Sequence, residues 1–237
     1  MLISVIIPVY NEERTVEKLV QTVFAVPIKK EVIIVNDNST DGTKSILDGI
    51  EKKLKEKPSL YVKGLEIIHK ETNEGKGAAI RTALSHISGD IVIIQDADLE
   101  TDPYEYPKLL EPFEKYGADI VFGSRFQMTG TRRVFRTHRY LTNRFLTMLS
   151  NIFSGIYITD METCYKLFRR DIIQSFKLKS KRFGIEPELT AKAAKGPWKI
   201  YEVPITYNPR DRSAGKKINW WDGVKAVLAI IRFNLSR

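Results

Sequence analysis

The chain has 237 residues, of which 43% are hydrophobic, and a formal net charge of +9 at pH 7. This composition excludes an intrinsically disordered protein, and the length suits one large domain or two small ones. The single cysteine, Cys164, excludes an internal disulfide framework, so we expect a reducing cytoplasm as the location. We expect no signal peptide, because Pro8 ends the opening apolar run far short of the roughly 20 residues of a membrane span.

The positive charge is concentrated in the second half of the chain. Residues 1–124 carry 15 Lys or Arg and 21 Asp or Glu, which gives a net charge of −6. Residues 125–237 carry 23 and 8, which gives +15. A basic half of this kind suits nucleic acid, anionic lipid or a phosphorylated substrate, and composition does not choose among them.

The first half alternates apolar, β-branched runs with amphipathic segments. The predicted strands, in chain order, are residues 3–8, 31–35, 65–69, 90–95 and 120–123. The predicted helices between them are residues 13–25, 43–57, 78–87 and 106–116. Continuous apolar strands separated by helices predict an α/β fold with a mostly parallel, Rossmann-like sheet flanked by helices.

Ligands bind such sheets beyond the carboxyl ends of the strands. Polar residues follow four of the predicted strands directly. They are Tyr10–Glu12, Asn36–Asn38, Lys70–Gly77 and Asp96–Asp98. This coincidence is the first indication of a functional site.

The second half opens with the Arg-rich stretch 125–144, which leads into an apolar helix ending near Phe153. A polar insert at 159–166 precedes a further strand, and residues 199–207 predict another. Residues 208–217 are basic and turn-rich, which is typical of a loop. With no linker and no repeat, we predict one domain over 1–237, with two parts at 1–124 and 125–219 and a C-terminal amphipathic helix at 220–237.

Asp96 and Asp98 flank Ala97 directly after an apolar strand. Residues i and i+2 of an extended chain point to the same side, so both carboxylates face one position where the strand ends. Mg²⁺ and Mn²⁺ prefer such oxygen ligands, and Glu100 adds a third carboxylate. The competing interpretation is a helix N-cap cluster before Pro103.

Other polar segments suit a nucleotide or an anion. Asp37 follows an apolar strand, where a carboxylate accepts hydrogen bonds from a base or a ribose. The glycines of Asn73–Gly77 would let backbone amides at a helix start approach an anion, although the P-loop and dinucleotide-binding spacings are absent. Asp41, in front of Gly42, is more simply a turn or helix cap.

An arginine cluster in the second half suits phosphate binding through paired hydrogen bonds, although a solvated basic loop is the usual explanation. Its members are Arg125, Arg132, Arg133, Arg136, Arg139 and Arg144. Asp160 and Glu162 lie in the polar insert, where either is a base for an acceptor or a structural partner of a nearby arginine. The closing helix, Trp221–Leu235, is too short to span a bilayer and suits either the membrane interface or packing against the core.

Together these segments resemble the family-2 glycosyltransferases, which have a GT-A fold, from Val5 to about Asp222. Four motifs at the ends of four predicted strands carry the resemblance. In chain order they are Val5–Glu13, Val35–Thr43, Asn73–Ala79 and Gln95–Glu100.

Within that family the chain is similar to the polyprenyl-phosphate branch, typified by dolichol-phosphate mannose synthases. The residues that carry this similarity are Asp96–Glu100, Gly123–Phe126 and Asp160–Lys166. Glu100 stands where the best-known mannose synthases have Gln, and Thr163–Lys166 replaces their commoner Ser-Gly-aromatic-Arg run. Many relatives also carry C-terminal membrane spans that are absent from this sequence. These departures concern the donor sugar more than the reaction type.

The resemblance implies that residues 1–124 form a nucleotide-sugar-binding half and residues 125–219 an acceptor-binding half. It also implies a role for each matching residue. The nucleotide sugar would be bound by Pro8, Tyr10, Glu12, Asp37, Lys76 and Asp96. A Mg²⁺ or Mn²⁺ ion would be bound by Asp96, Asp98 and Glu100. The acceptor phosphate would be held by Arg125 and Arg139, under a closing loop with Arg210 and Lys216.

We therefore expect inverting transfer of a hexose from a GDP-mannose or UDP-glucose type of donor to a polyprenyl or dolichyl phosphate at the cytoplasmic face of the membrane. A phosphate acceptor is already nucleophilic, so Asp98, Arg125 and Arg139 would carry catalysis without a strong base. For a glycan hydroxyl acceptor, the second hypothesis, Asp160 is the candidate base. A nucleotide- or RNA-binding module, the third, explains the charge but not the acidic residues of 96–100.

Overall fold

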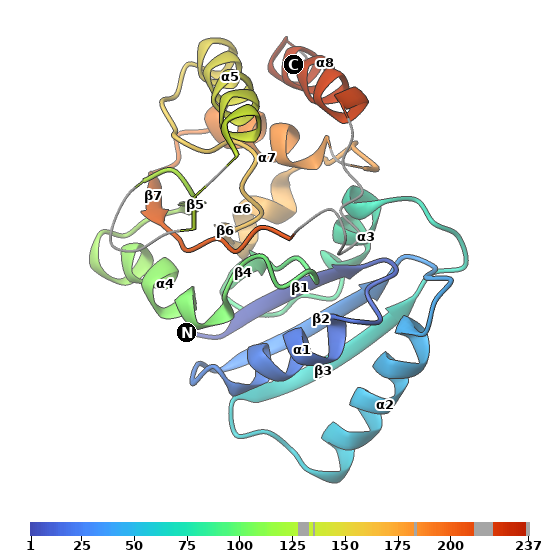
Figure 1. The fold of residues 1–237 in the computed structure, drawn as a ribbon. Coiled ribbons are helices and arrows are strands. Elements are labelled where there is room, and N and C mark those ends of the chain that lie inside the picture. The colour runs from blue at the N-terminus through green and yellow to red at the C-terminus, as the bar shows by residue number, and fades with distance from the viewer. Residues whose placement is uncertain (128–132, 135, 183, 211–219, 236–237) are drawn as a thin grey trace.

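The computed structural model describes residues 1–127, 133–134, 136–182, 184–210 and 220–235. Within them a seven-stranded sheet, in the order β3-β2-β1-β4-β6-β5-β7, forms the middle layer (Figure 1). The strands are β1 (Ile3–Val9), β2 (Lys30–Asn36), β3 (Val62–His69), β4 (Ile91–Ile94), β5 (Ile120–Ser124), β6 (Lys166–Arg169) and β7 (Ile200–Pro204). All neighbouring pairs are parallel except those of β6, which runs antiparallel between β4 and β5.

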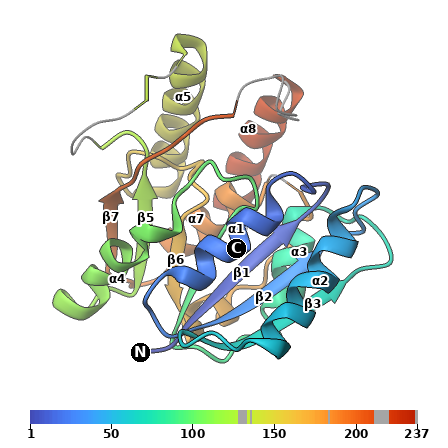
Figure 2. The same ribbon diagram turned by 60° about the horizontal axis from the view of Figure 1, so that its bottom comes forward.

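One face of the sheet is covered by α1 (Val16–Ala25), α2 (Thr43–Glu56) and α4 (Tyr106–Lys115), which follows the short 3₁₀ helix η1 (Pro103–Glu105). Figure 2 shows α1 lying across this face. Val20 and Leu109 are fully buried there, in one cluster with Val5 and Val32 of the sheet. The apolar stripes of these amphipathic helices therefore pack against strands that are apolar on both faces.

The other face is covered by α3 (Lys76–Ala83), α5 (Thr137–Ser154), α6 (Arg170–Ser175), α7 (Ile185–Ala194) and α8 (Trp220–Leu235). Ile80, Leu189 and Ile230 are buried there, in one cluster with Ile6 and Ile33. Helix α8 packs against α7 and α5 through Ala226, Ile230 and Phe233. Of the two interpretations of the closing helix, packing against the core is therefore confirmed for one of its faces.

The predicted α/β fold with a mostly parallel sheet is confirmed, and the strands and helices of the first half differ from their predicted ranges by only a few residues. The helix predicted over 13–25 begins at Val16, because the preceding residues form a turn in which the Thr15 amide donates to the Glu12 carbonyl (3.0 Å). Helices α6 and α7 were not predicted. The division into three functional parts stays a prediction. No helix of the described part of the chain is long and apolar enough to cross a membrane.

Candidate active site

The carboxyl ends of β1, β2 and β4 meet at one edge of the sheet, because these neighbouring strands are parallel. The loop after each strand contains a non-glycine residue in the left-handed conformation: Asn11, Asn38 and Leu99 have φ angles of 53°, 59° and 61°. Such backbone is unfavourable and is concentrated at functional sites. The carboxylates gathered here, which we call the acidic edge, are Glu12, Asp96, Asp98 and Glu100.

The buried Gln95 side chain fixes the loop that carries both aspartates. Its Oε1 accepts hydrogen bonds from the hydroxyls of Tyr106 (2.8 Å) and Tyr165 (2.7 Å), and its Nε2 donates to the Asp96 carbonyl (2.9 Å). A satisfied buried network of this kind restricts a loop to one conformation. Ala97 is buried, whereas Asp96 and Asp98 on either side of it are partly exposed.

Lys76 joins Asp96 to a carboxylate of another helix. Its ammonium lies 2.7 Å from Asp96 Oδ1 and 2.6 Å from Glu186 Oε1, at the start of α7. Burial alone would lower the pKa of Lys76, but the two carboxylates outweigh it and hold that pKa well above its usual value. Lys76 is therefore a permanent cation that partly neutralises the acidic edge.

Asp98 has much less compensation. Its Oδ1 accepts the Glu100 amide (3.0 Å), and Arg210 Nη2 lies 3.4 Å from its Oδ2. Burial and the neighbouring charges of Asp96 and Glu100 raise the pKa of Asp98 to about 7. A carboxyl group perturbed in this way marks a place that favours an added positive charge.

Arg210 crosses the acidic edge from the chain that follows β7. Its guanidinium makes a bidentate pair with Glu12, with both N–O distances at 2.9 Å. Its backbone amide donates to Glu100 Oε1 (2.7 Å), and the Tyr207 hydroxyl donates to the other oxygen of Glu100 (2.5 Å). Within the described part of the chain, no three His, Cys, Asp or Glu side chains are grouped closely enough to hold a metal ion.

Asp37 acts as an internal anion. Its carboxylate accepts the backbone amides of Glu74 (3.1 Å) and Gly75 (2.6 Å), and Lys70 Nζ lies 3.0 Å from it. The backbone amides of the glycine-rich segment Asn73–Gly77 therefore bind an anion, and that anion is the carboxylate of Asp37 in the same chain. Gly77 of the same segment is required for packing, because a Cβ at that position would collide with the Ser180 carbonyl.

Arg125 and Asp160 form a buried bidentate pair beside the acidic edge. Nε and Nη2 of Arg125 lie 2.6 and 2.7 Å from the Asp160 oxygens, and its backbone amide donates to the same carboxylate (3.0 Å). The Arg125 guanidinium lies 5.1 Å from the ring centre of Tyr207, whose hydroxyl binds Glu100. Burial would lower the pKa of Arg125, but Asp160 outweighs it and raises that pKa.

The remaining predicted site residues are Pro8, Tyr10, Arg139 and Lys216. Pro8 lies in β1 opposite Val35, and Tyr10 follows that strand with 38% of its surface exposed. Arg139 lies in the first turn of α5, and its side chain has no hydrogen-bond or ion-pair partner among the described residues. Lys216 and the rest of the predicted loop over 211–217 lie outside the described residues.

A second polar cluster is buried behind Arg125. Lys166 Nζ donates to the carbonyls of Met161 (2.7 Å) and Thr163 (2.8 Å), and burial lowers the Lys166 pKa to about 8. Glu162 Oε1 and Glu186 Oε2 are buried with no hydrogen-bond partner among the described residues. Burial, followed by the charge of Glu186, raises the pKa of Glu162 to about 7.

Replacing Glu162 with Gln should flatten the pH dependence of stability. The folded pKa of about 7 exceeds the ordinary value of 4.5, so the Glu162 contribution to stability is complete below about pH 4.5 and is lost as the pH rises through 7. The free energy of unfolding, measured with urea, should fall between pH 5 and pH 8. This fall should be smaller in E162Q than in the unsubstituted protein by roughly 2 kcal/mol. E114Q, on the exposed side of α4, is the control. Parallel pH curves for E162Q and the unsubstituted protein would contradict the assignment.

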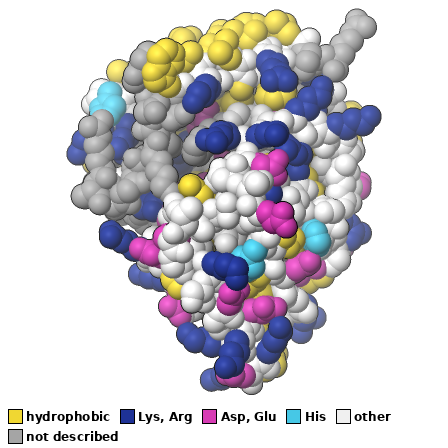
Figure 3. Space-filling view, turned by 90° about the vertical axis from the view of Figure 1, so that its right-hand side faces the viewer, with side chains coloured by type: hydrophobic (Ala, Val, Ile, Leu, Met, Phe, Trp, Pro, Cys, Tyr) yellow, Lys and Arg dark blue, Asp and Glu magenta, His cyan; other side chains and the backbone are white. Residues whose placement is uncertain are grey.

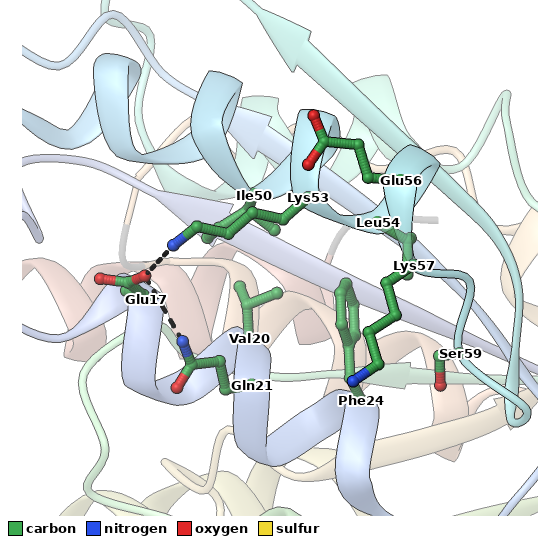
Figure 4. A pocket seen from close by; sticks show the side chains of 10 residues that line it. All are labelled: Glu17, Val20, Gln21, Phe24, Ile50, Lys53, Leu54, Glu56, Lys57 and Ser59. Atoms are coloured by element: carbon green, nitrogen blue, oxygen red, sulfur yellow. Dashed lines mark hydrogen bonds and ion pairs between the residues drawn. The ribbon is translucent and has the colours of Figure 1, made fainter.

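A pocket of about 390 Å³ lies between α1 and α2 (Figure 4). Val20, Phe24 and Ile50 contribute apolar surface to it, and Lys53 reaches across to Glu17 at 3.0 Å. None of its lining residues belongs to the acidic edge or to the predicted site. The candidate active site is therefore the edge where β1, β2 and β4 end, together with Arg125.

The family model described as glycosyl transferase family 2 matches residues 4–176, which include this whole edge. The chain belongs to glycosyl transferase family 2. An undecaprenyl-phosphate mannosyltransferase of Micrococcus luteus is 31% identical over all of this chain and 95% of its own length. A dolichol-phosphate mannosyltransferase of Pyrococcus furiosus is 29% identical over 91% of this chain, which spans 59% of that relative.

A solved structure of another glycosyl-transferring enzyme has a similar fold. The glucosyl-3-phosphoglycerate synthase of Mycobacterium tuberculosis, crystallised with Mn²⁺, UDP and phosphoglyceric acid, superposes with a TM-score of 0.72. It is 18% identical and covers 99% of this chain and 79% of its own. The resemblance to family-2 glycosyltransferases of the polyprenyl-phosphate branch is thereby confirmed, and the protein is a hexosyltransferase.

Two residues of this family-2 site were not predicted from the sequence. Glu186 anchors Lys76, and Tyr207 links Glu100 to Arg125. The sequence feature that could have indicated Glu186 is the acidic pair Glu186 and Glu188 at the start of an apolar segment. Tyr207 lies in a segment predicted only as a strand end, and nothing local distinguishes it.

Proposed function

We propose that the protein transfers a hexose from a nucleoside-diphosphate sugar to the phosphate of a polyprenyl or dolichyl lipid, with inversion at the anomeric carbon. The observation that carries this proposal is the position of Arg125 beside the acidic edge, with Tyr207 in contact with both. A donor diphosphate at the edge and an acceptor phosphate at Arg125 would lie next to each other. The names of the Micrococcus and Pyrococcus relatives support a lipid phosphate acceptor.

A divalent cation, Mg²⁺ or Mn²⁺, fits the acidic edge, and Asp96 and Asp98 would hold it. Burial, followed by the like charges of Asp96 and Glu100, raises the pKa of Asp98, and a dication would relieve the repulsion among these carboxylates. When bound, the cation offsets the negative charge that grows on the departing diphosphate. Glu100 would serve as a third ligand only after its hydrogen bonds from Tyr207 and Arg210 open.

Arg125 and Arg139 would neutralise the acceptor phosphate and align its oxygen opposite the leaving group. This nucleophile needs no strong base. Asp160 is committed to Arg125 on both of its oxygens, which favours a positioning role over that of a base. Because the prenyl tail of such an acceptor resides in a bilayer, we also propose peripheral association with the cytoplasmic face of the membrane.

A donor screen tests the proposal. Purified protein would be incubated with Mg²⁺ or Mn²⁺, a short prenyl phosphate, and GDP-mannose, UDP-glucose or UDP-N-acetylhexosamine in turn. Nucleoside diphosphate released together with a prenyl-phosphate sugar is the expected result for one of the donors. Transfer to a glycan hydroxyl, with none to any prenyl phosphate, would replace the proposed acceptor.

Replacing Arg139 with Ala should weaken use of the acceptor and leave use of the donor unchanged. Loss of one charge-assisted contact to phosphate corresponds to a rise in KM for prenyl phosphate of about 10-fold or more. Steady-state kinetics with each substrate varied in turn would measure this. Arg144→Ala, on the same helix, is the matched control and should leave both constants unchanged with a water-soluble acceptor. An unchanged KM in R139A would remove Arg139 from the acceptor site.

A further inference from the structure

The outward side of α5 is apolar along three turns. Leu141, Phe145, Met148 and Ile152 recur at spacings of four, three and four residues, which places them on one side of the helix. Their exposed fractions are 59%, 53%, 55% and 68%. At 1.5 Å per residue this stripe is about 16 Å long.

Helix α8 continues the same surface. Trp221 and Leu228 are 54% and 62% exposed, whereas Ile230 and Phe233 on the other side are buried in the core. Helices α5 and α8 contact each other, and hydrophobic side chains gather along that edge of the molecule in Figure 3, above a row of Lys and Arg. We call this surface the apolar ridge. Its members are Leu141, Phe145, Met148, Ile152, Trp221 and Leu228.

Charge distinguishes the partners that this ridge fits. Helix α5 contains no Asp or Glu, and its charged residues are Arg139 and Arg144; α8 adds Lys225 and Arg232 against a single acid, Asp222. A second copy of the chain docked through this face would bring like charges together, which is unfavourable. An anionic lipid surface offers both the apolar phase and the opposite charge.

We propose that the apolar ridge inserts into the interface of an anionic lipid bilayer and that the arginines beside it bind the lipid headgroups. This inference rests on the proposed function and deepens it by naming the surface that meets the membrane. The ridge is joined to the acceptor site, because the Tyr140 ring of α5 packs edge-on against Phe126 (5.5 Å) and Arg125 lies 5.6 Å from the same Phe126 ring. Docking through the ridge places Arg125 close to the headgroup layer, where a lipid phosphate lies.

The test compares vesicle binding of the unsubstituted protein with that of F145Q/M148Q/I152Q. Gln keeps the helix propensity of α5 and removes only apolar contact. Co-sedimentation with phosphatidylcholine–phosphatidylglycerol vesicles should be about 100-fold weaker or more, since insertion of each side chain contributes roughly a tenfold change in partitioning. L60Q/Y104Q, at exposed apolar positions away from the ridge, is the matched control and should bind as the unsubstituted protein does.

Circular dichroism and transfer to a short, water-soluble prenyl phosphate should be the same in both variants, which separates docking from folding and from chemistry. Equal vesicle binding by the ridge variant would overturn the docking proposal. The proposal would also be overturned if the unsubstituted protein did not bind vesicles and sedimented as a dimer, and the ridge variant sedimented as a monomer. Retained vesicle binding without transfer to any prenyl phosphate would instead refute the proposed function and leave the docking surface in place.

Discussion

Replacing Asp98 with Asn should lower kcat for sugar transfer by about 10²–10⁴-fold, while the protein stays folded. Asp98 faces Arg210 at 3.4 Å, and burial, followed by the charges of Asp96 and Glu100, raises its pKa to about 7. Asn keeps the size and one acceptor oxygen but removes the charge that would hold a cation. Removing that charge also relieves repulsion, so the melting temperature should not fall.

Nucleotide release and product formation would be measured over a range of Mn²⁺ concentrations. The control is Asp102→Asn, an exposed helix cap four residues away that accepts the Tyr104 amide (2.9 Å). D102N should retain the transfer rate of the unsubstituted protein. Full activity in D98N at any metal concentration would remove Asp98 from the centre of the site.

Replacing Asp160 with Ala should destabilise the fold by about 3–5 kcal/mol, because it leaves the Arg125 guanidinium buried without its partner. Asp160 is fully buried and accepts three hydrogen bonds from Arg125 alone. For a chain of this length, such a loss corresponds to a fall in melting temperature of roughly 6–20 °C. We also expect a higher KM for the acceptor below the new melting point, since Arg125 loses its fixed position.

Thermal unfolding and acceptor kinetics would be recorded on the same preparation. Asp48→Ala removes an exposed ion pair with Lys44 (3.0 Å) and is the control, because exposed pairs contribute little to stability. R125M tests the pair from the other side. If Arg125 and Asp160 act as one unit, the double variant should be more stable than D160A alone. A melting temperature of D160A equal to that of D48A would contradict this account.

The acidic edge can be predicted from the sequence because its information is local. Each carboxylate lies in the loop that follows an apolar strand, and parallel strands bring such loops to one edge of the sheet. The i and i+2 spacing of Asp96 and Asp98 is equally local. Ala97 is buried and both aspartates are partly exposed, but the backbone turns at Ala97 and Asp98, so their common orientation toward one cation stays a prediction.

The rest of the site depends on contacts that leave no local pattern. Helix α7 was missed because it is buried on almost every side, from Ile185 to Ala191, and such a helix has no amphipathic period. In the sequence, Glu186 and Glu188 even resemble the solvent-exposed face of a helix, although both are buried in the structure. The Arg125–Asp160 pair joins residues 35 positions apart, and either one alone is equally typical of a surface loop.

The pair between Arg210 and Glu12 has a consequence for biosynthesis. It joins residues 198 positions apart, so the acidic edge acquires this counter-charge only when nearly the whole chain has left the ribosome. Until then the first strands can pair, but their carboxylates repel one another without Arg210. Contacts of such long sequence separation form late and slowly. The nascent enzyme therefore completes the acidic edge last, after the strands that define it.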